Sequence, residues 1–305
     1  MMRYNNLSAY LRARYGGNVE KMCLDGGFTC PNRDGTKSIG GCIFCGERGA
    51  GEHIHGKVNI PAQRASFFRA RPKVQRAIAY FQNFTGTYAP VERLRTLYHD
   101  AIDDSRIVAL AIGTRPDAIT ESVADLLKEI GERVDVWVEL GLQTASDETA
   151  ARINRAYPTS DFDRAHRLLT ERGIGVVAHV MIGLPGEGQD ELARTIEYLN
   201  AYPLFGIKLH SVFVMRDTVL ESMYHCGEYT PLTMEEYVDL AVFALTHLPP
   251  DLTIHRLTGD CRRDQLVAPL WNADKDTVLS RIQRTLAERD LCQGAFYNEK
   301  DNIFP

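Results

Sequence analysis

Three cysteines near the N-terminus are the residues of this sequence with the clearest capacity for chemistry. Cys42 and Cys45 form a C-x-x-C pair, and Cys30 lies upstream of them with 11 residues in between. Turn-forming residues fill the intervening stretch: Pro31, Asn32, Asp34, Gly35, Gly40 and Gly41. Such residues let a loop fold around a bound object. The loop is therefore predicted to hold a metal or an iron–sulfur cluster.

Spacing alone leaves three interpretations of these cysteines open. A three-cysteine iron–sulfur cluster would keep one iron open to a further ligand, which suits catalysis. A structural zinc ion needs four ligands, and Cys23, His53 or His55 could supply the fourth. A thioredoxin-type pair also uses C-x-x-C, but beside a βαβ unit, whereas this pair lies in a Gly-rich loop.

Composition indicates an ordinary soluble globular protein. Of the 305 residues, 44% are apolar and 25% are charged, which is ample for a core. The first residues lack the apolar stretch of a signal peptide, and the odd number of cysteines, seven, argues against a disulfide framework. No run of 18 apolar residues is present, so we expect no membrane span and a cytoplasmic location.

Charge is distributed unevenly along the chain, although its net value is only -5. Residues 1–80 hold 13 Lys or Arg and 5 Asp or Glu, whereas the remainder holds 22 and 35. This asymmetry could create a positive surface around the N-terminal third. Solvated faces of loops and helices are the simpler alternative.

Short apolar runs alternate with amphipathic patterns over most of the chain. Besides a first strand around Cys23, strands are expected at 77–81, 107–112, 134–142, 175–182, 207–214 and 252–257. Helices are expected at 91–102, 121–130, 161–172, 190–202 and 275–290, and one more between the capping-box pair Thr233 and Glu236 and Pro249.

Repeated strand–helix units of this spacing predict an α/β fold with a parallel sheet and helical crossovers. An open doubly wound sheet and a full or partial barrel both remain possible. In either fold, function gathers at the loops after the strand C-termini. We divide the chain into an N-terminal segment with the cysteine loop (1–60), a core (61–225) and a C-terminal extension (226–305).

Seven sequence blocks, taken together, resemble a known family. They are GGFTCPNRDG…GGCIFC (26–45), AYFQNFTGTYAP (79–90), AIGTRPDAI (111–119), VELGLQTASDETAARINRAY (138–157), HVMIGLPGE (179–187), IKLH (207–210) and HRLTGD (255–260). In this order they resemble radical S-adenosylmethionine (SAM) enzymes, and most closely the YhcC/YtqA group. More distant similarity is to the elongator catalytic subunit and to oxygen-independent coproporphyrinogen oxidases.

The resemblance implies a fold, two cofactors and a reaction. The fold would be a partial (β/α)6 TIM-like barrel with a C-terminal extension. Cys30, Cys42 and Cys45 would ligate three irons of a [4Fe-4S] cluster, and SAM would bind the fourth. An electron from a donor such as flavodoxin or ferredoxin would then cleave SAM to a 5′-deoxyadenosyl radical, which abstracts hydrogen from the substrate.

The resemblance also implies a set of SAM contacts. Gln82 and Thr85 replace the Gly-Gly-Glu-like segment that usually holds the SAM amino group; Glu139 and Gln143 flank the end of a strand; Gly183 and Pro185 would let the backbone approach the adenine. A carboxylate within an apolar strand is costly unless it is paired. We therefore expect Glu139 to contact the SAM amine or ribose, the alternative being an ion pair with Arg115 or Arg155.

Several further residues are weaker candidates. His179, His210 and His255 lie within strands near the expected barrel mouth and could contact substrate. Cys226, Cys261 and Cys292 are isolated and are expected to be structural thiols. Cys23, in the first strand, is expected to pack rather than ligate.

The elongator-like similarity and the basic N-terminal third suggest tRNA as the substrate, with the C5 side chain of a wobble uridine as the target. The basic residues flanking the cysteine loop are expected near the mouth, where they would meet phosphates: Arg12, Arg14, Lys21, Arg64, Arg69, Arg71, Lys73 and Arg76. One alternative is a radical SAM enzyme for a small molecule such as a tetrapyrrole. Another is a non-catalytic, zinc-stabilised RNA-binding module.

Overall fold

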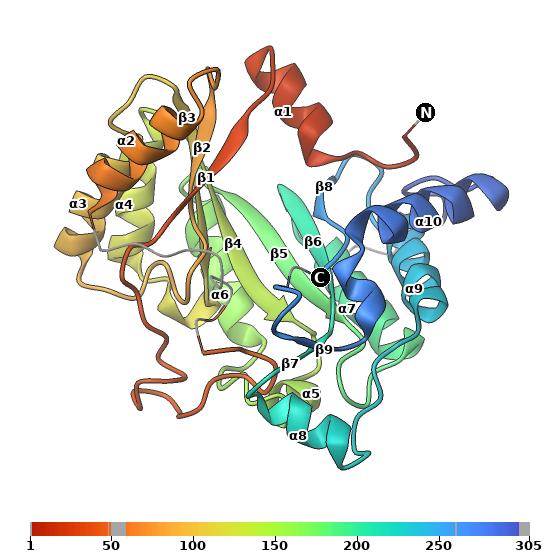
Figure 1. Ribbon diagram of the computed structural model, residues 1–305. Helices are drawn as coiled ribbons and strands as arrows, with labels where there is room; N and C mark the ends of the chain where they lie inside the picture. The colour runs from red at the N-terminus through yellow and green to blue at the C-terminus, as the bar shows by residue number, and fades with distance from the viewer. Residues whose placement is uncertain (1, 48, 50–58, 260, 299–305) are drawn as a thin grey trace.

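Seven parallel strands form one curled sheet, a half-barrel that is open on one side (Figure 1). The computed structural model describes residues 2–47, 49, 59–259 and 261–298. In spatial order the strands are β1 (Glu20–Leu24), β2 (Ala77–Phe81), β3 (Ile107–Thr114), β4 (Asp135–Gln143), β5 (Gly175–Ile182), β6 (Gly206–Ser211) and β8 (Thr253–Arg256). The predicted partial barrel is confirmed.

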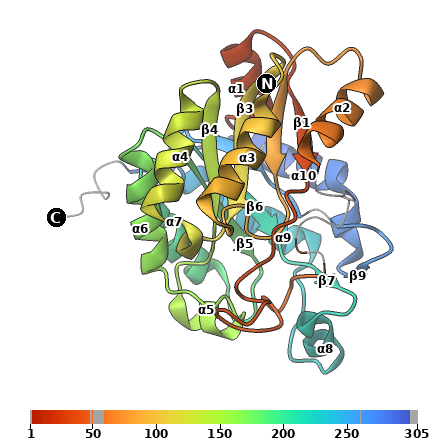
Figure 2. The same cartoon turned by 90° about the vertical axis from the view of Figure 1, so that its left-hand side faces the viewer.

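Helices cover the outer face of this sheet. Figure 2 looks onto α3 (Val91–Ile102), α4 (Glu121–Gly131) and α6 (Ser160–Thr170), which contact β3, β4 and β5. This layer also includes α2 (Ile60–Ala70), α7 (Gln189–Asn200) and α9 (Met234–His247), and α10 (Lys275–Glu288) packs against α9. The capping box predicted at Thr233 and Glu236 begins α9, as expected. None of the helices in the described ranges is long and apolar enough to cross a membrane.

Two features of the chain trace depart from the sequence prediction. The strand expected at 207–214 stops at Ser211, and the chain then enters β7 (Val214–Met215), which pairs antiparallel with β9 (Leu266–Ala268) in a separate small sheet. Four helices were also missed: α1 (Leu7–Tyr15), α2, α5 (Asp147–Arg152) and α8 (Val219–His225). Of the nine residues of α1, only Leu7 and Leu11 are buried, so it carries little apolar periodicity.

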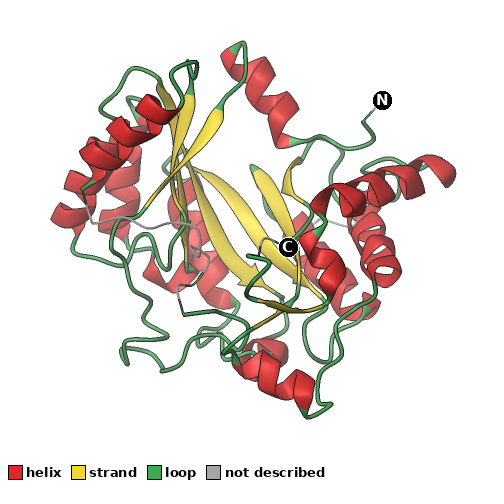
Figure 3. Ribbon diagram, viewed as in Figure 1, coloured by secondary structure: helices red, strands yellow, loops and turns green. Residues whose placement is uncertain are grey.

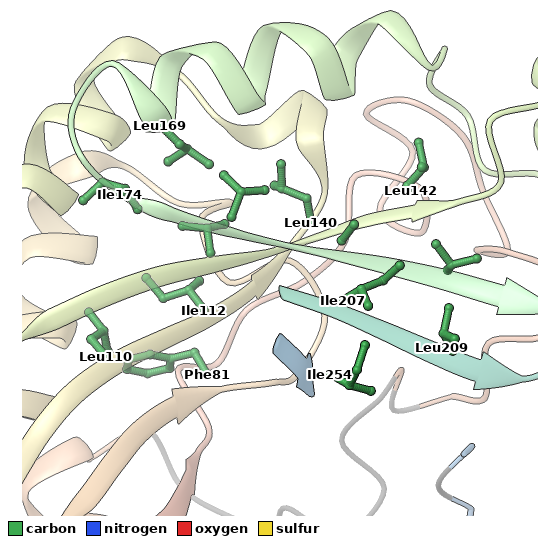
Figure 4. Packing of buried hydrophobic residues seen from close by; sticks show 14 of the residues in the cluster. Phe81, Leu110, Ile112, Leu140, Leu142, Leu169, Ile174, Ile207, Leu209 and Ile254 are labelled. Atoms are coloured by element: carbon green, nitrogen blue, oxygen red, sulfur yellow. The ribbon is translucent and has the colours of Figure 1, made fainter. Parts of the chain in front are cut away.

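Alternation along the strands separates two cores. Outward-facing side chains such as Phe81, Leu140 and Leu209 pack beneath the helices (Figure 4). Inward-facing residues near the N-terminal strand ends, including Ile78 and Trp137, form a second apolar cluster with Leu7 and Leu11 of α1. Helix α1 therefore closes one end of the half-barrel. The longer loops gather at the opposite end, where the strands finish (Figure 3).

Candidate active site

The three cysteines line one cavity of about 270 Å³ at the C-terminal ends of the strands. Four other predicted site residues line the same cavity: Gln82, Thr85, Glu139 and Gln143. Gly183 and Pro185 are not among its lining residues. The fold thus brings together cysteines from one loop with polar residues from β4 and the segment after β2.

Arg33 fixes the shape of the cysteine loop. Its guanidinium donates to the carbonyl oxygens of Cys45, at 2.9 Å, and Gly46, at 2.6 Å. Gly41, with φ of +82°, lies directly beneath it, because a Cβ added there would stand 2.9 Å from the Arg33 Nε. A side chain at position 41 would therefore displace the arginine. Sequence reasoning missed Arg33.

The NRAY segment after α5 is built around a fully buried arginine. Arg155 donates to the carbonyl oxygens of Leu142 at 2.6 Å and Thr144 at 2.8 Å, and pairs with Asp147 at 3.1 Å. These bonds hold the chain where it leaves β4. The position thus has a structural role in this protein.

Gln143, the last residue of β4, turns with φ of +63°. Its amide nitrogen lies 2.9 Å from the Tyr157 hydroxyl, which in turn donates to the Gly141 carbonyl oxygen. A Cβ at Gly141 would come within 2.6 Å of the Gln143 amide. A side chain at position 141 would therefore displace the Gln143 amide from this place.

A buried polar layer crosses the half-barrel next to these residues. Glu139, only 1% exposed, accepts at Oε2 from the Tyr80 hydroxyl at 2.5 Å and from the Lys208 ammonium, and the same oxygen lies 3.0 Å from His179 Nε2. All four side chains line the cavity. The Glu139 Oε1 atom is buried and has no hydrogen-bond partner among the described residues.

The alternative ion pair predicted for Glu139 was wrong in its partners. Arg115 pairs with Asp117 at 2.8 Å, and Arg155 pairs with Asp147. The cation that Glu139 meets is Lys208, from β6, two strands away. Because Lys208 and Tyr80 interrupt otherwise apolar strands, as Glu139 does, that interruption was the sequence signal that could have found them.

Burial and mutual contact set the protonation of this layer. Burial by itself would raise the pKa of Glu139, but the Lys208 ammonium and His179 outweigh it and hold that pKa well below its usual range. Burial lowers the pKa of Lys208 to about 7 and that of His179 to about 4. The carboxylate is thus ionised at neutral pH, and His179 is neutral.

The three candidate histidines do not share one environment. His179 and His210 both line the cavity, with their ring centroids 5.2 Å apart. His255 lies instead between Trp137 and Phe205, at centroid distances of 6.1 and 5.3 Å, and outside the cavity lining. Its surroundings are those of a packed residue.

Folding stability is expected to fall as the pH drops from about 6.5 to about 4. Burial lowers the pKa of His255 to about 3, as it lowers that of His179. In that window the unfolded chain binds protons that the folded chain excludes, so acid favours unfolding. Urea denaturation at about pH 7.5 and about pH 5 measures the loss, which should be smaller in His255→Leu. An equal loss of stability in the parent and in His255→Leu would show that burial of neutral His255 does not contribute to the pH dependence.

The remaining four cysteines are not among the residues that line this cavity. Cys23 faces inward from β1 in register with Tyr80, and its Sγ is 3.8 Å from Gln82 Oε1, but it does not line the cavity. Of the zinc ligands considered, His53 and His55 lie outside the described residues. All seven cysteines lie within the described residues, and none of them forms a disulfide. Within the described ranges, no three His, Cys, Asp or Glu side chains are placed to hold a single metal ion.

Gly183 and Pro185 lie in the turn that follows β5, and their carbonyl oxygens already accept hydrogen bonds from other side chains. The Gly183 carbonyl oxygen accepts from the Tyr229 hydroxyl at 2.8 Å, and a Cβ at position 183 would stand 2.9 Å from Leu232. The Pro185 carbonyl oxygen accepts from Arg152 at 3.0 Å. Contact of this turn with adenine stays a prediction.

The predicted position near the mouth was wrong for the basic residues at the ends of α1 and α2, whereas the Lys21 ammonium lies 5.3 Å from the ring centroid of the cavity residue Tyr80. Arg14 pairs with Asp135, the first residue of β4, and Arg71 pairs with Glu20, the first residue of β1. These residues therefore lie at the N-terminal ends of the strands, opposite the cysteine loop. The reason is topological, because a helix that follows a strand carries the chain back to the start of the next parallel strand.

Comparison with known protein families identifies the class. A model of the radical SAM superfamily matches residues 30–199, and one of the radical SAM C-terminal domain matches residues 205–288. The chain belongs to the radical SAM superfamily, whose enzymes use a [4Fe-4S] cluster and SAM. The family expected from the sequence blocks is confirmed.

Individual proteins within this superfamily are similar to the chain over most of its length. The chain is 38% identical to protein YhcC of Escherichia coli K12 over 288 residues, 94% of this chain and 93% of that protein. It is 37% identical to YtqA of Bacillus subtilis, over 97% of this chain and 93% of that protein. Among solved structures, the archaeal Elp3 of Methanocaldococcus infernus superposes with a TM-score of 0.69 at 18% identity. This match covers 90% of this chain and 64% of the Elp3 chain, and it shows a shared fold.

Proposed function

We propose that this enzyme modifies the C5 side chain of the wobble uridine in tRNA. Sequence similarity is the observation that carries the proposal. The chain is 29% identical over 202 residues to the tRNA uridine(34) acetyltransferase of Dehalococcoides mccartyi, which covers 65% of this chain and 42% of that enzyme. A second tRNA uridine(34) acetyltransferase, from Methanocaldococcus jannaschii, is 29% identical over 52% of this chain. Uridine 34 of tRNA is the feature that these relatives share by name.

The cysteine loop fits a [4Fe-4S] cluster with three protein ligands. Cys30, Cys42 and Cys45 line one cavity, and Arg33 holds the backbone beside Cys45. In a cubane cluster each thiolate binds a different iron, so the three sulfurs need not converge on one point. When bound, the cluster and SAM supply a 5′-deoxyadenosyl radical that abstracts hydrogen from the substrate. A small one-electron donor such as flavodoxin or ferredoxin would reduce the cluster.

Residues beside the loop fit SAM. Two buried acceptors facing this region, Thr85 Oγ1 and Glu139 Oε1, have no partner in the part of the chain that the structure describes. Buried polar atoms are normally hydrogen-bonded, so both are suited to a polar ligand. In this proposal Gln82, Thr85, Glu139 and Gln143 hold the amine and ribose of SAM, and the turn at Gly183 and Pro185 lies toward its adenine. Apolar packing beneath this layer excludes water from below.

The test is mass spectrometry of nucleosides from tRNA of a deletion strain. Loss or truncation of a modified wobble uridine is expected, and the intact gene should restore it. An unchanged set of wobble nucleosides would overturn the tRNA proposal and favour a small-molecule substrate such as a tetrapyrrole.

Charge-reversed variants test where tRNA approaches. Lys37, in the cysteine loop, and Arg216, next to the cavity residue Met215, are exposed cations at the mouth. Lys37→Glu combined with Arg216→Glu should restore the nucleoside poorly, because like charge repels the phosphate backbone. The matched control, Arg69→Glu with Lys73→Glu at the far end, should restore it fully. A reversed order would place tRNA at the far end.

A further inference from the structure

We propose that Asn32 donates a hydrogen bond to the Cys42 thiolate and thereby raises the reduction potential of the cluster. The inference rests on the ligand role that the proposed function gives Cys42. Asn32 is fully buried within the cysteine loop. Its Nδ2 lies 2.6 Å from the carbonyl oxygen of Asn154 and 3.7 Å from the Cys42 Sγ.

The contact with Asn154 fixes which end of the amide faces the sulfur. A carbonyl oxygen can only accept, so the atom 2.6 Å from it must be the amide nitrogen. One of the two amide hydrogens is used there. The second is available to Cys42, and a longer donor–acceptor distance is expected because sulfur is a larger acceptor than oxygen.

Neighbouring backbone bonds keep the amide in place. Asn154, with φ of +52°, donates through its own amide to the carbonyl oxygens of Gly41 at 2.7 Å and Ile39 at 3.3 Å. The Gly41 N–H donates in turn to the Asn32 carbonyl oxygen at 2.8 Å. These hydrogen bonds join the cysteine loop to Asn154 on both sides of Asn32. The Asn32 amide therefore cannot rotate away from Cys42 without breaking its bond to Asn154.

The Asn32 amide destabilises the fold through one unpaired atom, which indicates that its other atom has a function. Its Oδ1 is buried, and no donor within the described ranges makes a hydrogen bond to it. A buried unpaired carbonyl destabilises the folded state, and an apolar side chain of similar size would avoid that penalty. The amide nitrogen contacts the sulfur of Cys42, a proposed cluster ligand, and this contact is the one that an apolar side chain could not make.

The chemistry of the cluster gives that contact a direction. Reduction adds negative charge, part of which resides on the ligand sulfurs. A hydrogen-bond donor stabilises the reduced form more than the oxidised form and so raises the potential. Because the cluster must be reduced before SAM can be cleaved, Asn32 acts as a positioning and tuning residue for that step.

Redox titration of the SAM-free cluster, followed by electron paramagnetic resonance, tests the proposal. Asn32→Leu should keep its iron but show a more negative midpoint potential than the parent. Ser38→Ala is the matched control. It removes a hydroxyl of the same loop, which bonds the Asn154 Oδ1 at 3.4 Å, and it leaves the Asn154 carbonyl that orients Asn32 and the amide bonds to Gly41 and Ile39 in place. Its potential should match that of the parent.

The outcomes of this titration distinguish failure of the Asn32 proposal from failure of the proposed function. An unchanged potential in iron-loaded Asn32→Leu, or equal shifts in both variants, would overturn the role of Asn32 while leaving the proposed function standing. If Asn32→Leu fails to hold iron, the parent protein labelled with ¹⁵N at asparagine side-chain amides decides. Pulsed resonance of its reduced cluster should show a ¹⁵N coupling, and its absence would overturn the proposal. A parent chain that binds no cluster would overturn the proposed function itself.

Discussion

Alanine at Cys30, Cys42 or Cys45 is expected to abolish cluster binding. The parent, reconstituted without air, should hold about four irons per chain, as one cubane requires. Each substitution removes one of only three protein ligands from the loop, so each variant should purify colourless, with little iron. Iron assay and the visible absorption of the cluster measure the loss.

Cys23→Ala is the matched control for that experiment. Cys23 is a free thiol on β1 that faces Gln82 and lies outside the cavity lining. The variant should therefore keep its full iron content. Iron lost from Cys23→Ala but retained by Cys30→Ala would show that the ligand set is wrong.

Removing the Glu139 carboxylate alone is expected to destabilise the fold by about 3–5 kcal/mol. Glu139 and Lys208 are 1% and 2% exposed, so Glu139→Leu would bury the Lys208 amine without the carboxylate that stabilises its charged form, and its pKa, already lowered to about 7, would fall further. The double variant Glu139→Leu, Lys208→Met removes both charges and should regain most of the lost stability. Urea denaturation of the three proteins measures this. A double variant no more stable than Glu139→Leu would contradict the pairing.

The double variant also separates stability from SAM binding. If the unpaired Glu139 Oε1 contacts SAM, the stabilised double variant should still bind SAM much more weakly than the parent, with its iron content unchanged. Calorimetric titration of SAM into the cluster-loaded proteins gives the affinities. Parental affinity in the double variant would assign Glu139 a structural role only.

The sequence was informative where local pattern decides the structure. The cysteine spacing lies within one loop, and the parallel sheet with helical crossovers follows from alternating strands and helices, so both were predictable. The half-barrel itself was expected only from the resemblance to radical SAM enzymes. The polar layer was only half predictable. A lone carboxylate in an apolar strand signals a partner, but Lys208 is that partner because of strand order and side-chain direction, which the sequence does not display.

Two errors have the same physical origin. Basic residues adjacent to the cysteine loop in sequence lie at the opposite end of the sheet, because each crossover helix reverses the chain. Arg115 and Arg155 were the arginines considered as partners of Glu139, yet each pairs with an aspartate closer to it in the chain. Sequence neighbourhood predicted contacts well within a loop and poorly across strands.

Release of 5′-deoxyadenosine tests the central claim most directly. Cluster-loaded protein, reduced with dithionite and supplied with SAM, should release it slowly without substrate and faster with tRNA from the deletion strain. Cys42→Ala should release none. Intact SAM after incubation with a reduced, fully iron-loaded parent would contradict the assignment of this site to radical SAM chemistry.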